Sequence, residues 1–196
     1  MITQQEAKQI VGIILPVFAD VASEYDFGKY PAAPYTNFQT TFGEFNPSAQ
    51  DFENSLKWKW GHWDKQNFPK KQKILIHEIR DSWESFLVSG QQNIPIRTFE
   101  WWAARLGRAY ITVAYMTHLI HHRKSLPIID QHNFRAMNNL IRNVRPDFIF
   151  KKKPSNWQDV QNLKAFMEGI SQFMPRITFS ELDKFLMMYG RAHVPR

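Results

Sequence analysis

The stretch that decides the fold is LGRAYITVAYMTHLIHHRKSLPIIDQHNFRAMNNLIRNVR, residues 106–145. Its apolar residues recur at helical spacing on both sides of a short segment that contains Pro127. Gly107 interrupts the helical pattern, so we predict one helix that ends there and a second helix over residues 108–122. A third helix is predicted over residues 131–144, and Asp130 stands directly before it. An acidic residue at that position caps the exposed backbone amides of the helix.

Helical spacing continues through most of the chain, and no segment shows the sustained alternation of a β-strand. We therefore predict an all-α fold, a single helical domain over residues 1–196 that is built from two lobes. Residues 26–47 are rich in Pro and Gly and are expected to form a long aromatic loop. The other predicted helices cover residues 4–25, 69–89 and 98–105, one starts at Ser48 with Asp51, and two have capping-box spacing at 155–158 and 178–181.

Composition limits the possible functions. The chain of 196 residues contains no Cys, which excludes disulfides, thiol catalysis, Cys-ligated zinc and Cys-ligated iron-sulfur clusters. The formal net charge is +7, so the protein attracts polyanions such as nucleic acid. Aromatic residues make up 15% of the chain, and some of them are candidates for stacking on bases.

Nothing in the chain resembles a targeting or membrane segment. The first residues lack the charged and apolar order of a signal peptide, and the longest apolar run, at residues 110–120, is too short to span a bilayer. We expect a cytoplasmic protein, associated with the nucleoid if it binds DNA, that makes no membrane contact.

The segment from Leu106 to Arg145 resembles the catalytic core of the helix-hairpin-helix DNA glycosylases, which include endonuclease III, the adenine mismatch glycosylases and the 8-oxoguanine glycosylases. In these families a hairpin that ends in Gly is followed by a helix and then by Val-Asp-x-His-x-x-Arg. Here Asp130, His132 and Arg135 stand at the same offsets after Ile129. The resemblance implies two helical lobes with a DNA-facing cleft, a helix-hairpin-helix and catalytic segment at about 98–145, and a catalytic Asp130.

The segment departs from the family pattern at two places, the hairpin and the position of the lysine. The hairpin usually reads Leu-Pro-Gly-Val-Gly, whereas residues 103–107 read AARLG and keep only the last glycine. Bifunctional members carry a Lys two residues after that glycine, and Ala109 stands at this position. Without the amine a Schiff base cannot form, so the resemblance implies a monofunctional glycosylase that uses water and needs no cofactor.

The chemistry explains why a carboxylate is needed. Hydrolysis of an N-glycosidic bond develops positive charge on the deoxyribose, and an anion held beside the sugar stabilises that charge and orients water. The positive end of the helix dipole favours an anion at Asp130. An alternative interpretation is that Asp130 only caps the helix, which contributes about 1 kcal/mol.

A glycosylase of this kind extrudes the target nucleotide and holds it in a pocket. The candidates for this base pocket are Trp58, Trp60, His62, Trp63, Tyr35 and Phe38, with burial in the core as the alternative for each. The candidates for contacts with DNA, mainly with its phosphates, are Arg105, Gly107, Arg108, His132, Lys151, Lys152 and Lys153, although a charge run often forms only a solvated loop.

Other functions remain open. A non-catalytic DNA-binding module with the same fold is the main alternative to a monomeric enzyme that excises a damaged, mismatched or modified base, in repair or in defence against phage. An all-α scaffold for protein partners is a third possibility. His118, His121 and His122 have a spacing that can place two imidazoles on a metal ion, but no acidic residue follows closely, so we expect no metal.

Overall fold

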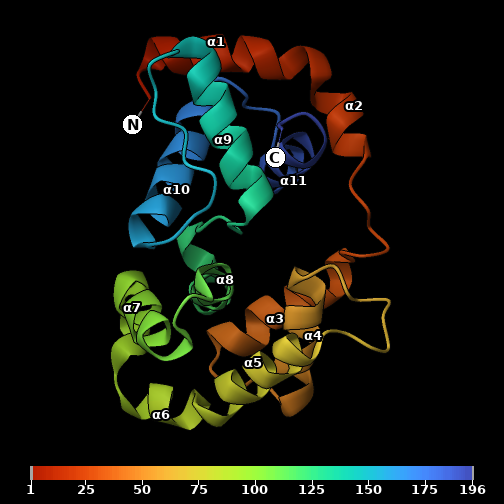
Figure 1. Ribbon diagram of the computed structural model, residues 1–196, viewed down its shortest axis with the longest axis vertical. Coiled ribbons are helices and arrows are strands. Elements are labelled where there is room, and N and C mark those ends of the chain that lie inside the picture. Colours follow the sequence, from red (N-terminus) through yellow and green to blue (C-terminus); the bar gives the residue numbers. More distant parts are fainter. Residues whose placement is uncertain (1, 196) are drawn as a thin grey trace. The chain divides into compact units, whose positions relative to one another are not determined.

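The computed structural model describes residues 2–195, and every regular element among them is a helix (Figure 1). Helices account for 69% of the chain and the described residues contain no strand, so the prediction of an all-α fold is confirmed. None of the described helices combines the length and the hydropathy that a membrane span requires.

The helices group into two compact units. We call Asp26–Leu126 the central unit, and Met1–Tyr25 together with Pro127–Arg196 the terminal unit. The helices of the central unit are α3 (Ala32–Gly43), α4 (Ala49–Lys59), α5 (Lys70–Asp81), α6 (Trp83–Val88), α7 (Pro95–Leu106) and α8 (Tyr110–Ile120), with 3₁₀ turns at Gln91–Asn93 and His122–Lys124. Those of the terminal unit are α1 (Gln4–Ile14), α2 (Phe18–Ser23), α9 (Gln131–Val144), α10 (Trp157–Ser171) and α11 (Phe179–Ala192), with a 3₁₀ turn at Leu15–Val17.

The core of the central unit is built around α8. Every residue from Thr112 to Ile120 is buried, which leaves this helix without a solvent face. Both α7 and α3 pack against α8 (Figure 1). A helix that is apolar on all sides belongs in the middle of a helical unit, so the near-continuous apolar run explains this placement.

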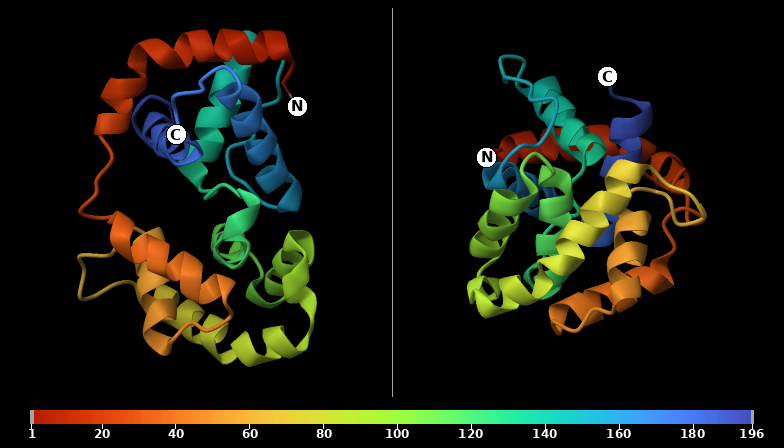
Figure 2. Two further views of the ribbon diagram at one scale, coloured as in Figure 1. Left: turned by 180° about the vertical axis from the view of Figure 1, so that it is seen from behind. Right: turned by 60° about the horizontal axis from the view of Figure 1, so that its bottom comes forward.

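The terminal unit is organised around the pair α9 and α11. A Cβ atom built on Gly190 in α11 would lie 1.8 Å from the backbone oxygen of His132 in α9, so the two helices are in direct backbone contact at this point. In the same unit, α1 packs against both α9 and α10 (Figure 1; Figure 2, left).

Helix starts are well encoded in this sequence. The capping boxes predicted from Ser48 with Asp51 and from Thr178 with Glu181 both form. The third predicted box is displaced, because α10 is capped by Asn156 and Asp159 rather than by residues 155 and 158. The Asn156 side chain accepts the Asp159 amide at 3.0 Å, and Asp159 accepts back from the backbone of Asn156.

Two of the predicted helices are divided in the structure. Residues 4–25 do not form one helix, because α1 ends at Ile14 and Pro16 cannot continue the hydrogen-bond ladder. The predicted helix over 69–89 is divided at Ser82, whose ψ of −5° departs from helical geometry.

The largest correction concerns residues 26–47, which are not one long loop. They contain α3, a helix of 12 residues that begins after Pro31. Pro34 falls in the first turn of α3, where a backbone N–H has no partner within the helix, so this proline does not disrupt it. Tyr35 and Phe38 therefore lie on a helix.

Candidate functional site

Asp130 is the N-cap of α9. Its Oδ1 atom accepts hydrogen bonds from the backbone amides of His132 at 2.6 Å and Asn133 at 3.0 Å. In return, the side-chain oxygen of Asn133 accepts the backbone amide of Asp130 at 2.9 Å. Asp130 is partly exposed. The carboxylate is therefore held in one orientation at the positive end of a helix, without being sealed inside the terminal unit.

Asn133 fixes this arrangement, and sequence reasoning did not identify it. It is 1% exposed, and its amide nitrogen donates to the Ile128 carbonyl at 2.6 Å and to Asp183 Oδ1 at 3.1 Å. These bonds tie the start of α9 to the preceding segment and to α11. The available signal was the position of Asn133 three residues after a predicted N-cap, where a side chain can bond back to the cap.

The other two residues of the Asp-x-His-x-x-Arg pattern lie on the same turn of α9. Arg135 is buried and donates from Nη2 to the Gly190 carbonyl at 2.5 Å. The same nitrogen lies 3.3 Å from Nδ1 of His132, which is partly exposed. Arg135 thus connects α9 to α11. Of Arg135 and His132, only His132 is accessible to solvent.

The segment in which a hairpin was predicted contains α7, a turn at Gly107 and α8, all in the central unit. Gly107 has φ +56° and ψ −117°, a conformation that favours glycine, and the space around it is open. The backbone amide of Gly107 donates to the Ala103 carbonyl at 3.1 Å. This N–H therefore completes the last turn of α7 and is not available to bind a phosphate. Ala109 precedes α8 and offers no side-chain cap to the first amides of that helix.

Two arginines flank the hairpin turn, and both are exposed. The Arg105 guanidinium lies 3.9 Å from the centre of the Trp101 ring, which orients it along α7. Arg108 occupies the turn itself, beside the uncapped start of α8.

A group of four stacked rings lies in the central unit and consists of Trp58, Tyr35, Tyr115 and His118. Trp58 is buried, with Tyr35 stacked at 4.7 Å and Tyr115 at 6.1 Å, and its indole N–H donates to the Pro31 carbonyl at 2.9 Å. His118 extends the stack beyond Tyr35 and Tyr115. Trp58 therefore has no open face for a base.

The other aromatic candidates divide by exposure. Phe38 is buried and contacts Trp63 at 6.2 Å between ring centres. Trp60, His62 and Trp63 follow the end of α4 and are partly exposed. The Nδ1 atom of His62 is buried and has no hydrogen-bond partner among the described residues. Together with Tyr35, which is also partly exposed, these three residues offer the accessible aromatic surface of the candidate set.

His118 is a structural histidine in this arrangement. Its Nδ1 atom lies 2.6 Å from the Leu126 carbonyl, which can only accept, so Nδ1 carries the proton and Nε2 accepts the hydroxyl of Tyr35. Burial is the main cause that lowers the pKa of His118 to about 4, with smaller contributions from the nearby charges of Lys59 and His122. The imidazole is neutral at pH 7.

His121 forms a hydrogen bond with a different partner. Its Nε2 atom lies 2.8 Å from the Thr98 hydroxyl, which itself donates to the Gln91 carbonyl. Burial, with a contribution from Lys124, lowers the pKa of His121 to about 4. No group of three metal-ligating side chains with suitable geometry is present within residues 2–195.

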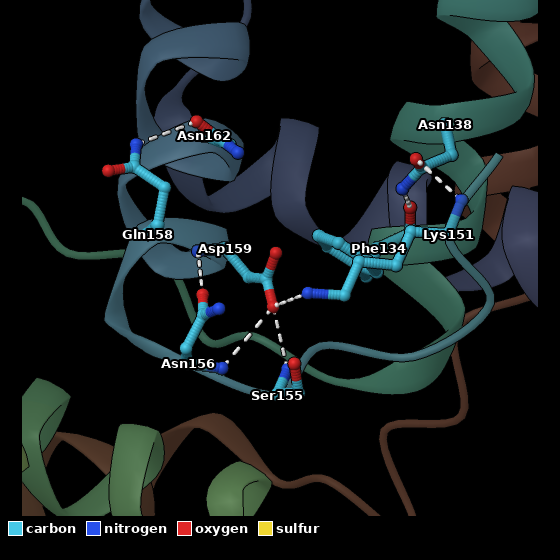
Figure 3. A network of polar contacts seen from close by, with 8 residues as sticks. All are labelled: Phe134, Asn138, Lys151, Ser155, Asn156, Gln158, Asp159 and Asn162. Carbon is cyan, nitrogen blue, oxygen red and sulfur yellow. Dashed lines mark hydrogen bonds and ion pairs between the residues drawn. The ribbon is translucent and has the colours of Figure 1, made fainter. Parts of the chain in front are cut away.

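The predicted basic run follows α9 as an irregular segment. The Lys151 ammonium forms an ion pair with the buried Asp159 carboxylate at 2.5 Å (Figure 3). Lys152 and Lys153 are exposed. Lys151 is therefore held within the terminal unit, whereas the next two lysines face solvent.

In comparisons with protein families, curated proteins and solved structures, no match to this chain was found.

Proposed function

We propose that this protein is a monofunctional DNA glycosylase that hydrolyses the N-glycosidic bond of an extruded base, with Asp130 as its catalytic residue. The observation that carries the proposal is the Asp130 carboxylate, held by two backbone amides at the start of α9 and still partly exposed. A fixed anion stabilises the positive charge of the sugar without reorganisation during the reaction.

The elements around Asp130 in the chain support the same function. A helix, a glycine turn and a second helix precede it, as in the helix-hairpin-helix glycosylases that residues 106–145 resemble. The DNA-facing cleft and the hairpin contact with phosphate that the resemblance implies are parts of the proposal. Within the hairpin, the uncapped start of α8 beside Arg108 is the part suited to an anion.

The proposed roles of the other residues follow from their exposure. Trp60, His62 and Trp63 are the proposed base contacts, because each is partly exposed, whereas Trp58 and Phe38 are buried. Tyr35 is also partly exposed, but its ring is stacked on Trp58 and its hydroxyl is bonded to His118. Arg105, Arg108, His132, Lys152 and Lys153 are the proposed DNA contacts. Ala109 replaces the amine of the bifunctional enzymes, so the proposed product is an intact strand with an abasic site.

The test is a panel of labelled duplexes, each with one modified or mismatched base, incubated with the protein and then treated with alkali. An active glycosylase produces strand breaks on at least one duplex after alkali and none before it. Breaks that appear before alkali would contradict the monofunctional assignment.

The decisive variant is Asp130→Asn. Asparagine caps a helix as well as aspartate does, so this change removes the charge and leaves the start of α9 in place. The Asp130→Asn protein is expected to bind the duplex with unchanged affinity and to release the base at least about 100-fold more slowly. Thr178→Ala is the matched control, because it weakens another cap in the terminal unit and leaves Asp130 untouched. Unaltered base release by Asp130→Asn would overturn the proposal, and binding without any base release would favour the non-catalytic module.

A further inference from the structure

The terminal unit contains a cavity of about 250 Å³ that is lined by residues of α9 and α10 and of the segment between them. Its wall is mainly apolar and includes Phe134, Phe148 and Phe166. Ile149 and Asn162 also line it and are exposed, so the cavity opens to solvent. An apolar cavity of about 150 Å³ is enough to hold benzene. This one therefore has room for a single aromatic heterocycle.

The charged groups in the wall are compensated within the protein. The Arg145 guanidinium is paired with Glu6 through two contacts of 2.7 Å. The Lys151 ammonium is paired with Asp159 at 2.5 Å. Because the two positive and two negative charges cancel, the cavity favours an uncharged ligand over an organic cation or anion.

One edge of the cavity retains hydrogen-bonding capacity. Asp159 is 4% exposed, and its Oδ2 atom accepts from Lys151 and from the amides of Ser155 and Asn156 (Figure 3). Its Oδ1 atom has no hydrogen-bond partner among the described residues, and Figure 3 draws it on the side opposite these contacts. A carboxylate oxygen without a partner, on a buried residue that lines a cavity, is an acceptor for a ligand N–H.

Asn162 supplies the complementary group. Its side-chain oxygen accepts from Gln158 at 3.0 Å, while its amide nitrogen has no partner among the described residues (Figure 3). Asp159 and Asn162 are three residues apart on α10 and share a face of that helix. The wall thus presents an acceptor and a donor on the same face of α10.

We propose that this cavity binds one free, uncharged nucleobase. The phenylalanine rings pack against the flat heterocycle, and its hydrogen-bonding edge donates to Asp159 Oδ1 and accepts from the Asn162 amide. Uracil and adenine both carry neighbouring donor and acceptor groups on one edge. The inference does not rest on the glycosylase activity, because none of the groups that form the cavity is Asp130.

The first test is titration of the purified protein with uracil and with adenine, followed by protein NMR spectra. At least one base is expected to saturate, with shifts confined to residues around the cavity. Benzamidine and benzoate are flat probes of opposite charge and are expected to bind at least tenfold more weakly. Failure of both bases to saturate at their solubility limits, or preference for either charged probe, would overturn the proposal.

The second test uses variants at the mouth of the cavity. Asn162→Trp fills the opening, and at an exposed helical position it is expected to fold normally and to bind the base at least 20-fold more weakly. Glu168→Trp is the matched control, because this residue is exposed on the same helix and does not line the cavity. Asn162→Ala removes only the donor and is expected to weaken binding about tenfold.

Asp130→Asn separates this inference from the proposed function. The variant is expected to bind the free base like the wild type, whether or not it has lost base release. Wild-type affinity in Asn162→Trp, or loss of affinity in Asp130→Asn, would place the base elsewhere and refute the cavity as its site.

Discussion

The carboxylate of Glu6 and the guanidinium of Arg145 form a two-contact ion pair, with Nε 2.7 Å from Oε1 and Nη2 2.7 Å from Oε2. This pair joins α1 to the residue that follows α9, 139 positions further along the chain. The hydrogen bonds from Arg145 are the main cause that lowers the pKa of Glu6 to about 2, below its ordinary value of 4.5.

The first prediction concerns acid stability and follows from this pair. A carboxyl group with a lowered folded-state pKa stabilises the fold above its unfolded pKa and loses that contribution as pH falls through the folded value. The stability advantage of wild type over Glu6→Gln is therefore expected to be full above pH 4.5, to decline towards pH 2 and to vanish below it. Urea denaturation at several pH values measures this difference. An advantage of wild type over Glu6→Gln that is independent of pH would contradict the prediction.

The second prediction concerns the two buried histidines of the central unit. Because the pKa values of His118 and His121 are lowered to about 4, the unfolded chain takes up protons below about pH 6.5 that the folded protein does not. Stability should fall between pH 6.5 and 4, by up to about 1.4 kcal/mol per pH unit for each histidine. His118→Asn keeps a donor for the Leu126 carbonyl and should lose one histidine's share of that slope in chemical denaturation. A variant with the same slope as the wild type would show that His118 is not the group that titrates.

The third prediction tests the support of Asp130. Asn133→Asp places a second carboxylate against Asp183, now 3.1 Å from the Asn133 nitrogen, and removes the donor to the Ile128 carbonyl. We expect a loss of about 3 kcal/mol in the free energy of unfolding. Adding Asp183→Asn restores one donor and should recover about half of the loss, which a double-mutant cycle measures. Strict additivity of the two changes would refute the contact.

The fourth prediction concerns the crossing of α9 and α11. Gly190→Ala would bring a methyl group to 1.8 Å from the backbone oxygen of His132. Because this oxygen belongs to the backbone of a packed helix, it cannot move away unless the helices shift apart. We expect a loss of about 3 kcal/mol or more in thermal or chemical unfolding. Gly12→Ala is the matched comparison, because its helical position is open, and this change should stabilise the protein by about 0.5–1 kcal/mol. Similar effects of the two substitutions would contradict the close approach.

The fifth prediction separates lysines that look alike in the sequence and rests on the proposed DNA binding. The affinity of Arg108→Ala or Lys152→Ala for duplex DNA should show a salt dependence weaker by about 0.9 in logarithmic slope, because one fewer DNA phosphate is neutralised by the protein. Lys151→Ala should leave that slope unchanged and lower stability instead, because its ammonium is paired with Asp159. An equal decrease of the slope at residues 151 and 152 would show that Lys151 also reaches DNA.

Local patterns predicted those features that are decided within a few residues. The α9 helix begins and ends where expected, Gly107 ends α7, and two of the capping boxes form as predicted. Capping and helix termination depend on neighbours three or four positions away, so the sequence contains the whole signal. The missed helix α3 shows the limit of composition, because the position of Pro34 within the first turn matters more than its presence.

The sequence by itself determined that the chain is helical, that it lacks every cysteine-based chemistry, and that a carboxylate stands at the start of a helix after a helix pair. Only the tertiary structure decided that Asn133 and Asp183 support that carboxylate, that Trp58 is buried against Tyr35 and Tyr115, and that Lys151 is paired with Asp159. The physical reason is range: a helix start is fixed by hydrogen bonds to near neighbours, whereas burial and pairing depend on side chains that reach one another only after distant helices pack.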